Sequence, residues 1–295
     1  MTDPMKILIT GAGGMLGTDL GNALSQEFEI VGLERRPVTH LTVPYDICDL
    51  TQARKTREAI LSHKPEMIIH TAAMTDVDYC EEHHDEALEN NVAATEHVID
   101  AANEIDAAVI FYSTDYVFDG KKGELYTEDD APNPLNVYGK SKLAGEEAVQ
   151  KHAGSFLLFR TSWVFGNGPQ NFIYKFRQWS QKSRVIKLSA DEVSVPTSSA
   201  DLVSVTLTSL EKGLKGLHHL TNSGYASRYE LGRYVAKVLS LDNLIIPVPM
   251  STFPSTLQRP AFTAMSNARL QKHLGLSIRD WRSAVDLFFK EYPPQ

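Results

Sequence analysis

The sequence has few cysteines and no long apolar stretch. Only Cys48 and Cys80 occur among 295 residues, too few for a disulfide framework or a cysteine-rich metal site, which favours a reducing, cytoplasmic location. No run approaches the roughly 18 consecutive apolar residues of a membrane-spanning helix, so we expect no membrane segment. The N-terminus lacks a basic stretch followed by an apolar core, so we expect no signal peptide.

Positive charge is also in short supply. Twenty-nine Lys and Arg residues face 37 Asp and Glu residues, for a formal net charge of −8. Such an acidic chain is a poor nucleic-acid binder, so an anionic ligand must be bound locally, by backbone N–H groups or a few basic side chains. A hydrophobic fraction of 42% and a charged fraction of 22% are typical of a globular protein.

Strand-like apolar runs alternate with helix-period segments over the first 160 residues. The predicted strands lie at 6–10, 29–33, 67–70, 107–112 and 155–160, and the predicted helices end near 26, 62, 105 and 151. This alternation indicates parallel strands with helices on both faces. We therefore predict an α/β fold, a doubly wound parallel (Rossmann) sheet.

A glycine-rich turn follows the first predicted strand. Gly11, Gly14 and Gly17 have the spacing G-x-x-G-x-x-G, with Met15 and Leu16 opening the next helix. Glycines permit a close approach of the backbone to a pyrophosphate, and the helix N-terminus attracts its negative charge. This loop predicts a dinucleotide site.

The end of the second predicted strand carries charges of both signs. Glu34 would bind a ribose 2′-hydroxyl and favour NAD(H), whereas Arg35 and Arg36 would pair with a 2′-phosphate and favour NADP(H). The sequence leaves both cofactors open.

The second half of the chain is looser and richer in loops. Amphipathic helices are expected at 227–239 and 278–291, the latter with a capping-box-like start at Ser277 and Asp280. We predict a dinucleotide-binding Rossmann domain over residues 1–165. Residues 166–295 would form mainly a smaller, mixed α/β substrate-binding lobe, with some segments returning to the Rossmann domain.

Polar groups suited to carbonyl reduction gather after the fourth predicted strand. Tyr138 and Lys142 lie one helical turn apart, and Ser113 and Thr114 end the strand at the edge where α/β sites lie. Tyr138 can give a proton to a carbonyl oxygen, and a nearby Lys142 cation would lower the phenol pKa. Thr114 or Ser113 can orient the carbonyl. No metal ligands are predicted, since the pairs His83-His84 and His218-His219 suit surface or packing roles.

With these motifs the chain resembles the extended short-chain dehydrogenase/reductase superfamily and, within it, the dTDP-4-dehydrorhamnose reductase family. The resemblance spans nearly the whole length. Its more specific elements are Ser113-Thr114-Asp115-Tyr116-Val117-Phe118-Asp119-Gly120, then Pro134 to Glu146 around Tyr138 and Lys142, then Arg160-Thr161-Ser162-Trp163-Val164 and Arg259-Pro260.

The resemblance implies an NAD(P)H-dependent enzyme acting on a dTDP-sugar. It implies a catalytic trio of Thr114, Tyr138 and Lys142. The further residues it implies are Asp46 and Ile47 at the adenine, Ala72 and Ala73 beside the cofactor, Asn91 bracing the site, and Trp163 and Arg259 at the substrate. A homodimer and a magnesium ion are compatible with it, but the sequence assigns no ligands to such an ion.

Two further readings stay open beside reduction of a 4-keto sugar nucleotide. One is a sugar-nucleotide 4-epimerase, and the other is a noncatalytic NADP-binding subunit resembling the regulatory subunit of methionine adenosyltransferase. Similar dehydratases carry Thr-Asp-Glu where this chain has Tyr116, which argues against elimination. The family pattern Asp-Gln-x-Gly-x-Pro-Thr reads Asp191-Glu192-Val193-Ser194-Val195-Pro196-Thr197 here, which leaves the identity of the keto-sugar open.

Overall fold

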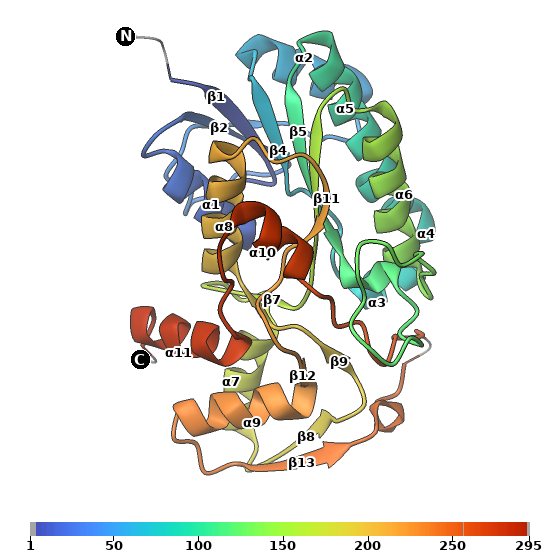
Figure 1. Ribbon diagram of the computed structural model, residues 1–295, viewed down its shortest axis with the longest axis vertical. Coiled ribbons are helices and arrows are strands. Elements are labelled where there is room, and N and C mark those ends of the chain that lie inside the picture. The colour runs from blue at the N-terminus through green and yellow to red at the C-terminus, as the bar shows by residue number, and fades with distance from the viewer. Residues whose placement is uncertain (1–3, 256, 294–295) are drawn as a thin grey trace.

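A seven-stranded parallel sheet forms the centre of the larger part of the molecule (Figure 1). The computed structural model describes residues 4–255 and 257–293; the outer ends of the two predicted domains, residues 1–3 and 294–295, lie outside these. In spatial order the strands are β11 (Gly216–His219), β6 (Phe156–Thr161), β5 (Ala108–Thr114), β4 (Met67–His70), β1 (Lys6–Thr10), β2 (Glu29–Glu34) and β3 (Tyr45–Ile47). The order reverses between β1 and β4, and ligands of open α/β sheets bind at such a switch point.

Helices cover both faces of this sheet because its central strands are apolar on both sides. In β1, Ile7 and Ile9 pack with Leu20 and Leu202, while Leu8 packs with a separate cluster on the other face. One face carries α1 (Met15–Leu24), α8 (Ser199–Glu211) and α10 (Ala268–Leu274); the other carries α2 (Ala53–His63), α5 (Ala94–Glu104) and α6 (Val137–His152). The predicted doubly wound α/β fold is confirmed.

Two helix predictions need correction. The single helix predicted to end near residue 105 is built from α4 (His84–Leu88), a π-helical turn (Glu89–Ala93) and α5, and a short α3 (Val77–Glu82) precedes them. The last helix, α11 (Trp281–Glu291), begins after Asp280, whose carboxylate caps the Arg282 N–H at 2.9 Å. Ser277 is not its cap, because the chain before Trp281 runs extended against Ser223.

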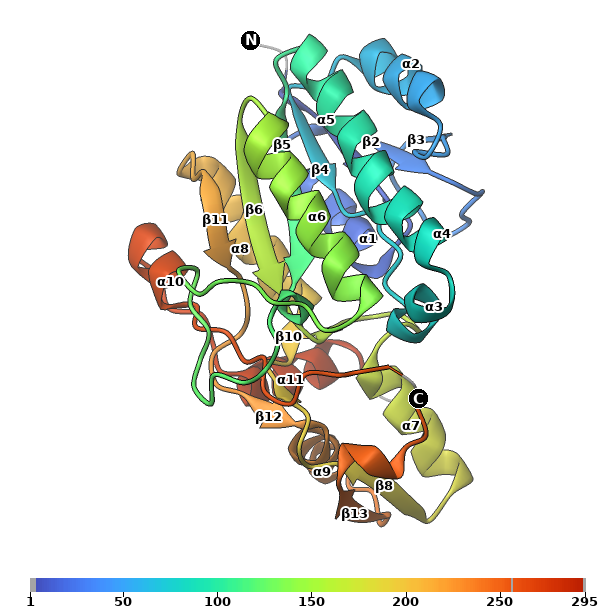
Figure 2. The ribbon, with the colours of Figure 1, turned by 90° about the vertical axis from the view of Figure 1, so that its right-hand side faces the viewer.

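A smaller part lies beyond the carboxyl ends of the central strands (Figures 1 and 2). Its helices are α7 (Phe172–Lys182), α9 (Arg228–Val238) and α11, and its strand pairs are β8 (Val185–Ser189) with β13 (Leu244–Val248), β9 (Val193–Ser194) with β12 (Ala226–Ser227), and β7 (Val164–Phe165) with β10 (Thr197–Ser198). A separate apolar core, which includes the fully buried Trp281 and Phe176, holds these elements together.

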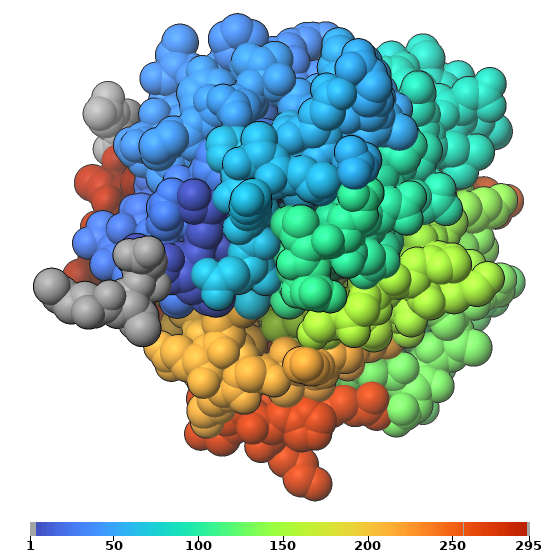
Figure 3. Space-filling view, turned by 90° about the horizontal axis from the view of Figure 1, so that it is seen from above, coloured from blue at the N-terminus to red at the C-terminus, as the bar shows by residue number. Residues whose placement is uncertain are grey.

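The chain passes between the two parts more than once. After β10 it returns to the large sheet as α8 and β11, and then enters the smaller part again at β12 (Figure 2). Figure 3 shows the end of the molecule away from the smaller part, where residues from the first half of the chain lie beside the orange residues of α8 and β11. Among the described residues, no helix has both the length and the apolar character needed to span a membrane.

Candidate active site

The glycine loop joins β1 to α1 at the switch point of the sheet. Gly11 has a φ of +65°, and a side chain there would lie 2.8 Å from the Ala72 backbone. A side chain on Gly17 would lie 2.2 Å from the Gly11 carbonyl oxygen. Gly14 precedes α1 without a side-chain cap, so the first N–H groups of this helix remain available to an anion. The loop therefore has the close backbone turn and the available N–H groups that suit the binding of a pyrophosphate.

Three cavities follow one another from this loop toward the smaller part. The first, of about 360 Å³, lies beside β2 and is lined by Gly11, Gly13, Gly14, Glu34, Arg35, Asp49, Leu50, Ala72 and Ala73, among others. The central one, of about 530 Å³, lies at the ends of β5 and β6. The outer one, of about 580 Å³, shares Phe172, Trp179, Arg228 and Arg259 with the central cavity.

Of the three charged residues at the end of β2, Glu34 and Arg35 line the first cavity. The Glu34 carboxylate accepts a hydrogen bond from the Gly13 N–H at 2.5 Å, and the Arg35 guanidinium donates to the Asn90 side chain at 3.1 Å. Arg36 is exposed and does not belong to the lining. Of these three residues, the structure thus brings Glu34 and Arg35, but not Arg36, to the place predicted for the adenosine ribose.

The structure does not bring Asp46 and Ile47 to this cavity, which corrects the sequence prediction. Ile47 is 54% exposed, and the Asp46 carboxylate pairs with His63 at 2.7 Å. Both lie inside β3, because Leu33 and Glu34 of β2 pair with them. Asp49 and Leu50 come after the strand ends and line the cavity instead.

Thr114, Tyr138 and Lys142 line the central cavity together. Thr114 is the last residue of β5, while Tyr138 and Lys142 lie one turn apart near the start of α6. Helix α6 can approach the end of β5 because residue 139 is glycine: a Cβ there would lie 2.3 Å from the Tyr116 carbonyl oxygen. The Asn136 side chain caps the helix by accepting the Gly139 N–H at 2.9 Å.

Burial shifts the pKa of both titratable groups, Tyr138 and Lys142, in opposite directions. It raises the pKa of the Tyr138 phenol above its usual value, and a hydrogen bond with Thr114 only partly opposes this. Burial also lowers the pKa of Lys142 to about 8, with the ammonium 4.1 Å above the centre of the Phe111 ring. The expected lowering of the phenol pKa by Lys142 is not found in the protein alone, where burial and the nearby Asp115 raise this pKa, so Tyr138 is protonated at neutral pH.

Asn91 stands behind the cavity and does not line it. Its amide nitrogen donates to the Met74 carbonyl at 3.0 Å and to the Ser141 hydroxyl at 2.9 Å, while its oxygen accepts the Met74 N–H at 2.8 Å. All of these partners belong to the protein, so Asn91 braces α6 against the segment after β4.

His70, which the sequence reasoning did not single out, lies beneath the same region. Its ring nitrogens contact the hydroxyls of Thr10 at 2.7 Å and Thr95 at 3.1 Å. Burial lowers the pKa of His70 to about 3, with a smaller contribution from the Lys142 charge. The imidazole is therefore neutral at physiological pH.

Ser113, Trp163 and Arg259, the predicted substrate contacts, also line the central cavity. The Ser113 hydroxyl is buried without a hydrogen-bond partner among the described residues, and so is that of Thr161 on the same lining. Such hydroxyls can bind a polar ligand. Arg259 donates to the Tyr116 hydroxyl at 3.2 Å and to Asp78 at 2.6 Å.

The sequence reasoning missed Arg228 altogether. Its guanidinium lies 3.5 Å from the centre of the Trp163 ring, and Trp163 itself has a φ of +40°, a backbone state that non-glycine residues adopt mainly under constraint. The sequence did hold a signal for the position of Arg228, because the capping box of Ser227 and Glu230 indicates that a helix, α9, begins at this residue.

Asp115 joins the two parts of the molecule beside the site. Its buried carboxyl accepts hydrogen bonds from Ser194 of β9 at 2.6 Å and from Thr263. Burial raises its pKa, and these hydroxyl contacts oppose the rise. The residue after Thr114 is therefore fixed by the smaller part.

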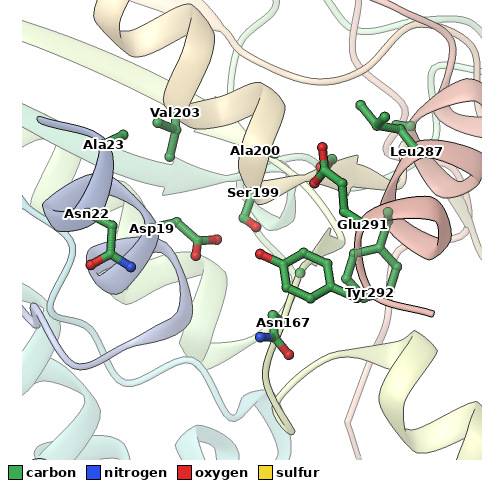
Figure 4. Close-up of a pocket in the computed structure, with 14 residues that line it drawn as sticks. Asp19, Asn22, Ala23, Asn167, Ser199, Ala200, Val203, Leu287, Glu291 and Tyr292 are labelled. Carbon is green, nitrogen blue, oxygen red and sulfur yellow. The ribbon is translucent and has the colours of Figure 1, made fainter. Parts of the chain in front are cut away.

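A fourth cavity, of about 370 Å³, lies apart from this row, between α1, α8 and α11 (Figure 4). The carboxylates of Asp19 and Glu291 and the side chains of Ser199, Tyr292 and Asn167 line it. Across residues 4–255 and 257–293 no group of three His, Cys, Asp or Glu side chains is arranged to hold a metal ion.

Comparisons with known proteins agree with this geometry. The family model described as the RmlD substrate binding domain matches residues 5–293. The chain is 31% identical to the spore coat polysaccharide biosynthesis protein SpsK of Bacillus subtilis, over 97% of each chain. It is 31% identical to dTDP-4-dehydrorhamnose reductase of Escherichia coli K12, over 97% of this chain and 98% of the other. The structure of dTDP-4-dehydrorhamnose reductase from Bacillus anthracis in complex with NADP matches with a TM-score of 0.91 at 29% identity, covering 98% of this chain and 99% of that one.

Proposed function

The chain belongs to the RmlD substrate binding domain family, the family of its dTDP-4-dehydrorhamnose reductase relatives, and we propose that it reduces the 4-keto group of dTDP-4-dehydrorhamnose to form dTDP-L-rhamnose. The observation that carries this proposal is the central cavity, where Tyr138, Lys142 and the Ser113 hydroxyl, which has no partner in the described part of the chain, meet beside the glycine loop. A ketone held there has a proton donor and a hydrogen-bond donor within one pocket.

The residues present fit a dinucleotide cofactor, NADP(H) or NAD(H). The glycine loop leaves a cradle that added Cβ atoms would fill, and the uncapped start of α1 suits a pyrophosphate. Ala72, Ala73, Asp49, Leu50, Glu34 and Arg35 would hold the adenosine half in the first cavity, and Met15 and Leu16 would lie beside the nicotinamide half. When bound, the reduced cofactor supplies the hydride.

The side chains of this chain would then divide the remaining work. Tyr138, whose phenol burial keeps protonated, donates its proton to the carbonyl oxygen as C4 is reduced, and Thr114 and Ser113 hold that oxygen in place. Lys142 would bind the nicotinamide ribose and return a proton to the phenolate. The large sheet and α1 would form the cofactor-binding part, and the smaller part would bind the sugar nucleotide.

Tyr116 favours reduction over elimination of water. Its ring lies edge-on to Tyr138 with centroids 5.8 Å apart, and burial raises the pKa of its phenol, with a further rise from Glu192. A protonated phenol at this place cannot act as the carboxylate base that dehydration needs.

Turnover of the reduced cofactor tests the proposal. The wild type should oxidise NADPH or NADH with dTDP-4-keto-6-deoxy sugars, and Tyr138→Phe should lower kcat by about 10²- to 10⁴-fold while still binding the cofactor. Tyr174→Phe, at a 39% exposed tyrosine of α7, is the matched control. Epimerisation without net oxidation of added cofactor would instead support a 4-epimerase, and tight cofactor binding without turnover would support a noncatalytic subunit.

Two predictions from the sequence belong with this proposal. A cytoplasmic location agrees with Cys48 and Cys80, which are free and buried, and fractionation of cells tests it. The homodimer stays a prediction, for which the molar mass in solution from light scattering is the direct measurement.

A further inference from the structure

Glu192 places a carboxylate on the wall of the outer cavity. The residue follows β8 and is 8% exposed. Its side chain lines the outer cavity, and its carboxylate contacts the Tyr116 hydroxyl. No other acidic side chain lines the outer cavity within the described ranges. A negative charge here is notable, because an anionic sugar nucleotide would have to bind beside it.

All contacts of this carboxylate with the described residues are long. The Tyr116 hydroxyl donates to it at 3.5 Å, the Ser189 hydroxyl at 3.3 Å, and the Arg228 guanidinium lies at 3.6 Å. Hydrogen bonds to a carboxylate are normally about 2.5–2.9 Å long, and its two oxygens can accept about four. Glu192 therefore retains the capacity to accept a closer donor from the cavity.

The position of Glu192 points to the sugar of the bound nucleotide. Tyr116, which contacts Glu192, is itself the edge-on neighbour of Tyr138, so the carboxylate lies one side chain away from the proposed proton donor. The donors that a sugar ring offers at this distance are its hydroxyl groups.

Lys187 and Lys175 also line the outer and central cavities, but both side chains are exposed, where solvent screens their charge. The two arginines beside Glu192 are therefore the cations that matter most for a charged group on the sugar.

Arg228 stacks on Trp163 and faces Glu192, whereas Arg259 pairs with Asp78 and the Tyr116 hydroxyl. Each arginine on the wall is thus matched with one acid. An additional carboxylate on the sugar would find Glu192 close by and neither arginine free of a partner among the described residues.

We propose that Glu192 is a specificity-determining residue that accepts a hydrogen bond from a hydroxyl of the sugar and disfavours sugar nucleotides whose sugar carries a carboxylate. This inference rests on the proposed function, because it assumes a sugar nucleotide in the central and outer cavities. Under this proposal the contacts of Glu192 with Tyr116 and Arg228 help to select the substrate, in addition to the contacts that bind the diphosphate.

Binding of three ligands tests the proposal: dTDP, dTDP-glucose and dTDP-glucuronate, each titrated calorimetrically into the cofactor-loaded protein. The wild type should prefer dTDP-glucose to dTDP-glucuronate by about tenfold or more, as expected for two like charges within one cavity. Glu192→Gln keeps the shape and an acceptor oxygen but removes the charge, so the preference should narrow to about twofold. Glu124→Gln, at an exposed glutamate outside the site, should leave it unchanged.

A second variant isolates the hydrogen bond. Glu192→Met removes the acceptor, so the affinity for dTDP-glucose should fall by about tenfold. The affinity for dTDP should stay within about twofold of the wild-type value. An unchanged preference for dTDP-glucose over dTDP-glucuronate in Glu192→Gln would overturn the inference. An equal loss of affinity for dTDP and dTDP-glucose in Glu192→Met would also overturn it, because Glu192 would then only support the fold or the diphosphate contacts.

Turnover separates this inference from the proposed function. If the wild type shows the expected preference but oxidises no NADPH or NADH with dTDP-4-keto-6-deoxy sugars, the proposed reaction fails and the role of Glu192 stands. If turnover occurs and Glu192→Gln leaves the binding preference unchanged, the proposed reaction stands and the role of Glu192 fails.

Discussion

The side-chain amide of Asn91 donates a hydrogen bond to the Ser141 hydroxyl at 2.9 Å, and that hydroxyl donates in turn to the Tyr138 carbonyl at 2.9 Å. The segment after β4 is thereby joined to the first turns of α6, which carry Tyr138 and Lys142. A residue that lies outside the cavity thus fixes the position of two residues that line it.

Asn91→Ala should lower both stability and turnover. The backbone N–H and C=O of Met74 and the Ser141 hydroxyl would each lose a buried partner, so we expect a loss of about 2–3 kcal/mol in the free energy of unfolding. We expect kcat to fall about tenfold with little change in cofactor affinity, because the amide does not reach the cavity. Denaturant unfolding and steady-state kinetics measure the two effects.

Ser141→Ala removes only one of these contacts and should have a smaller effect on both quantities. A large loss of cofactor affinity in Asn91→Ala, with kcat preserved, would show that Asn91 acts on the cofactor and not on α6.

Lys142→Met should stabilise the protein without cofactor while impairing catalysis. Burial lowers the pKa of Lys142 to about 8, against about 10.4 in an unfolded chain. Below pH 8 the ammonium is charged in both states and its burial disfavours folding; above about pH 10.4 it is neutral in both, and this penalty is absent. The free energy of unfolding should therefore rise with pH through this window.

At pH 7 the methionine variant should be more stable than the wild type by about 2–3 kcal/mol, with a weaker dependence on alkaline pH. Lys140→Met, at an exposed lysine of the same helix, should change stability by less than about 0.5 kcal/mol. Thermal unfolding of the cofactor-free protein over pH 7–10.5 is the measurement. A Lys142→Met protein that is less stable than the wild type at pH 7 would contradict the prediction.

The sequence predicted those site residues that local secondary structure brings together. Tyr138 and Lys142 lie within one helix, and Thr114 ends a strand that pairs with its neighbours by regular rules, so their convergence followed from periodicity and from the carboxyl edge of the sheet. The fold class followed from the same alternation of apolar runs.

Register and long-range packing escaped prediction. The run Asp46-Ile47-Cys48-Asp49 offers two acids, and only the pairing of β3 with β2 decides that Asp49, after the strand, reaches the cavity. Arg228 and Glu192 meet because α9 packs beside the loop after β8, a contact set by the core of the smaller part and not by local pattern.

His70 should make the protein sensitive to acid. Its pKa is lowered to about 3 in the fold, against about 6.5 when unfolded, so between pH 6.5 and 3 the unfolded state binds more protons and stability falls as pH falls. His70→Asn keeps groups that can bond Thr10 and Thr95 but cannot titrate. Between pH 7 and 4.5 the wild type should lose about 2–3 kcal/mol more than the variant.

Unfolding by urea at pH 7, 6, 5 and 4.5 tests this difference. The buried His219, whose pKa is also lowered to about 3, remains in both proteins, so some acid sensitivity should persist in His70→Asn. Identical pH dependence of the two proteins would show that His70 does not titrate between the folded and unfolded states in this range.

The buried ion pair between Glu146 and Arg160 should be the most sensitive electrostatic contact of the fold. Glu146 is 0% and Arg160 2% exposed, and the guanidinium donates to both carboxylate oxygens, at 2.6 to 3.1 Å. Glu146→Gln would leave a buried, uncompensated cation, so we expect a loss of about 3–5 kcal/mol in the free energy of unfolding. Glu58→Gln, in the exposed pair with Arg54, should lose less than about 1 kcal/mol.

The same substitution should also change the pKa of Lys142. The Glu146 charge raises the pKa of Lys142 against the lowering by burial, so in Glu146→Gln the pKa of Lys142 should fall further below 8, and the alkaline limb of the pH–kcat profile should move to lower pH. Replacing both partners, as Glu146→Met with Arg160→Met, should recover much of the stability, because no unpaired charge remains buried. The shift of the pH profile should persist in that double variant, since the Glu146 carboxylate is still absent; a return to the wild-type profile would separate Lys142 from Glu146.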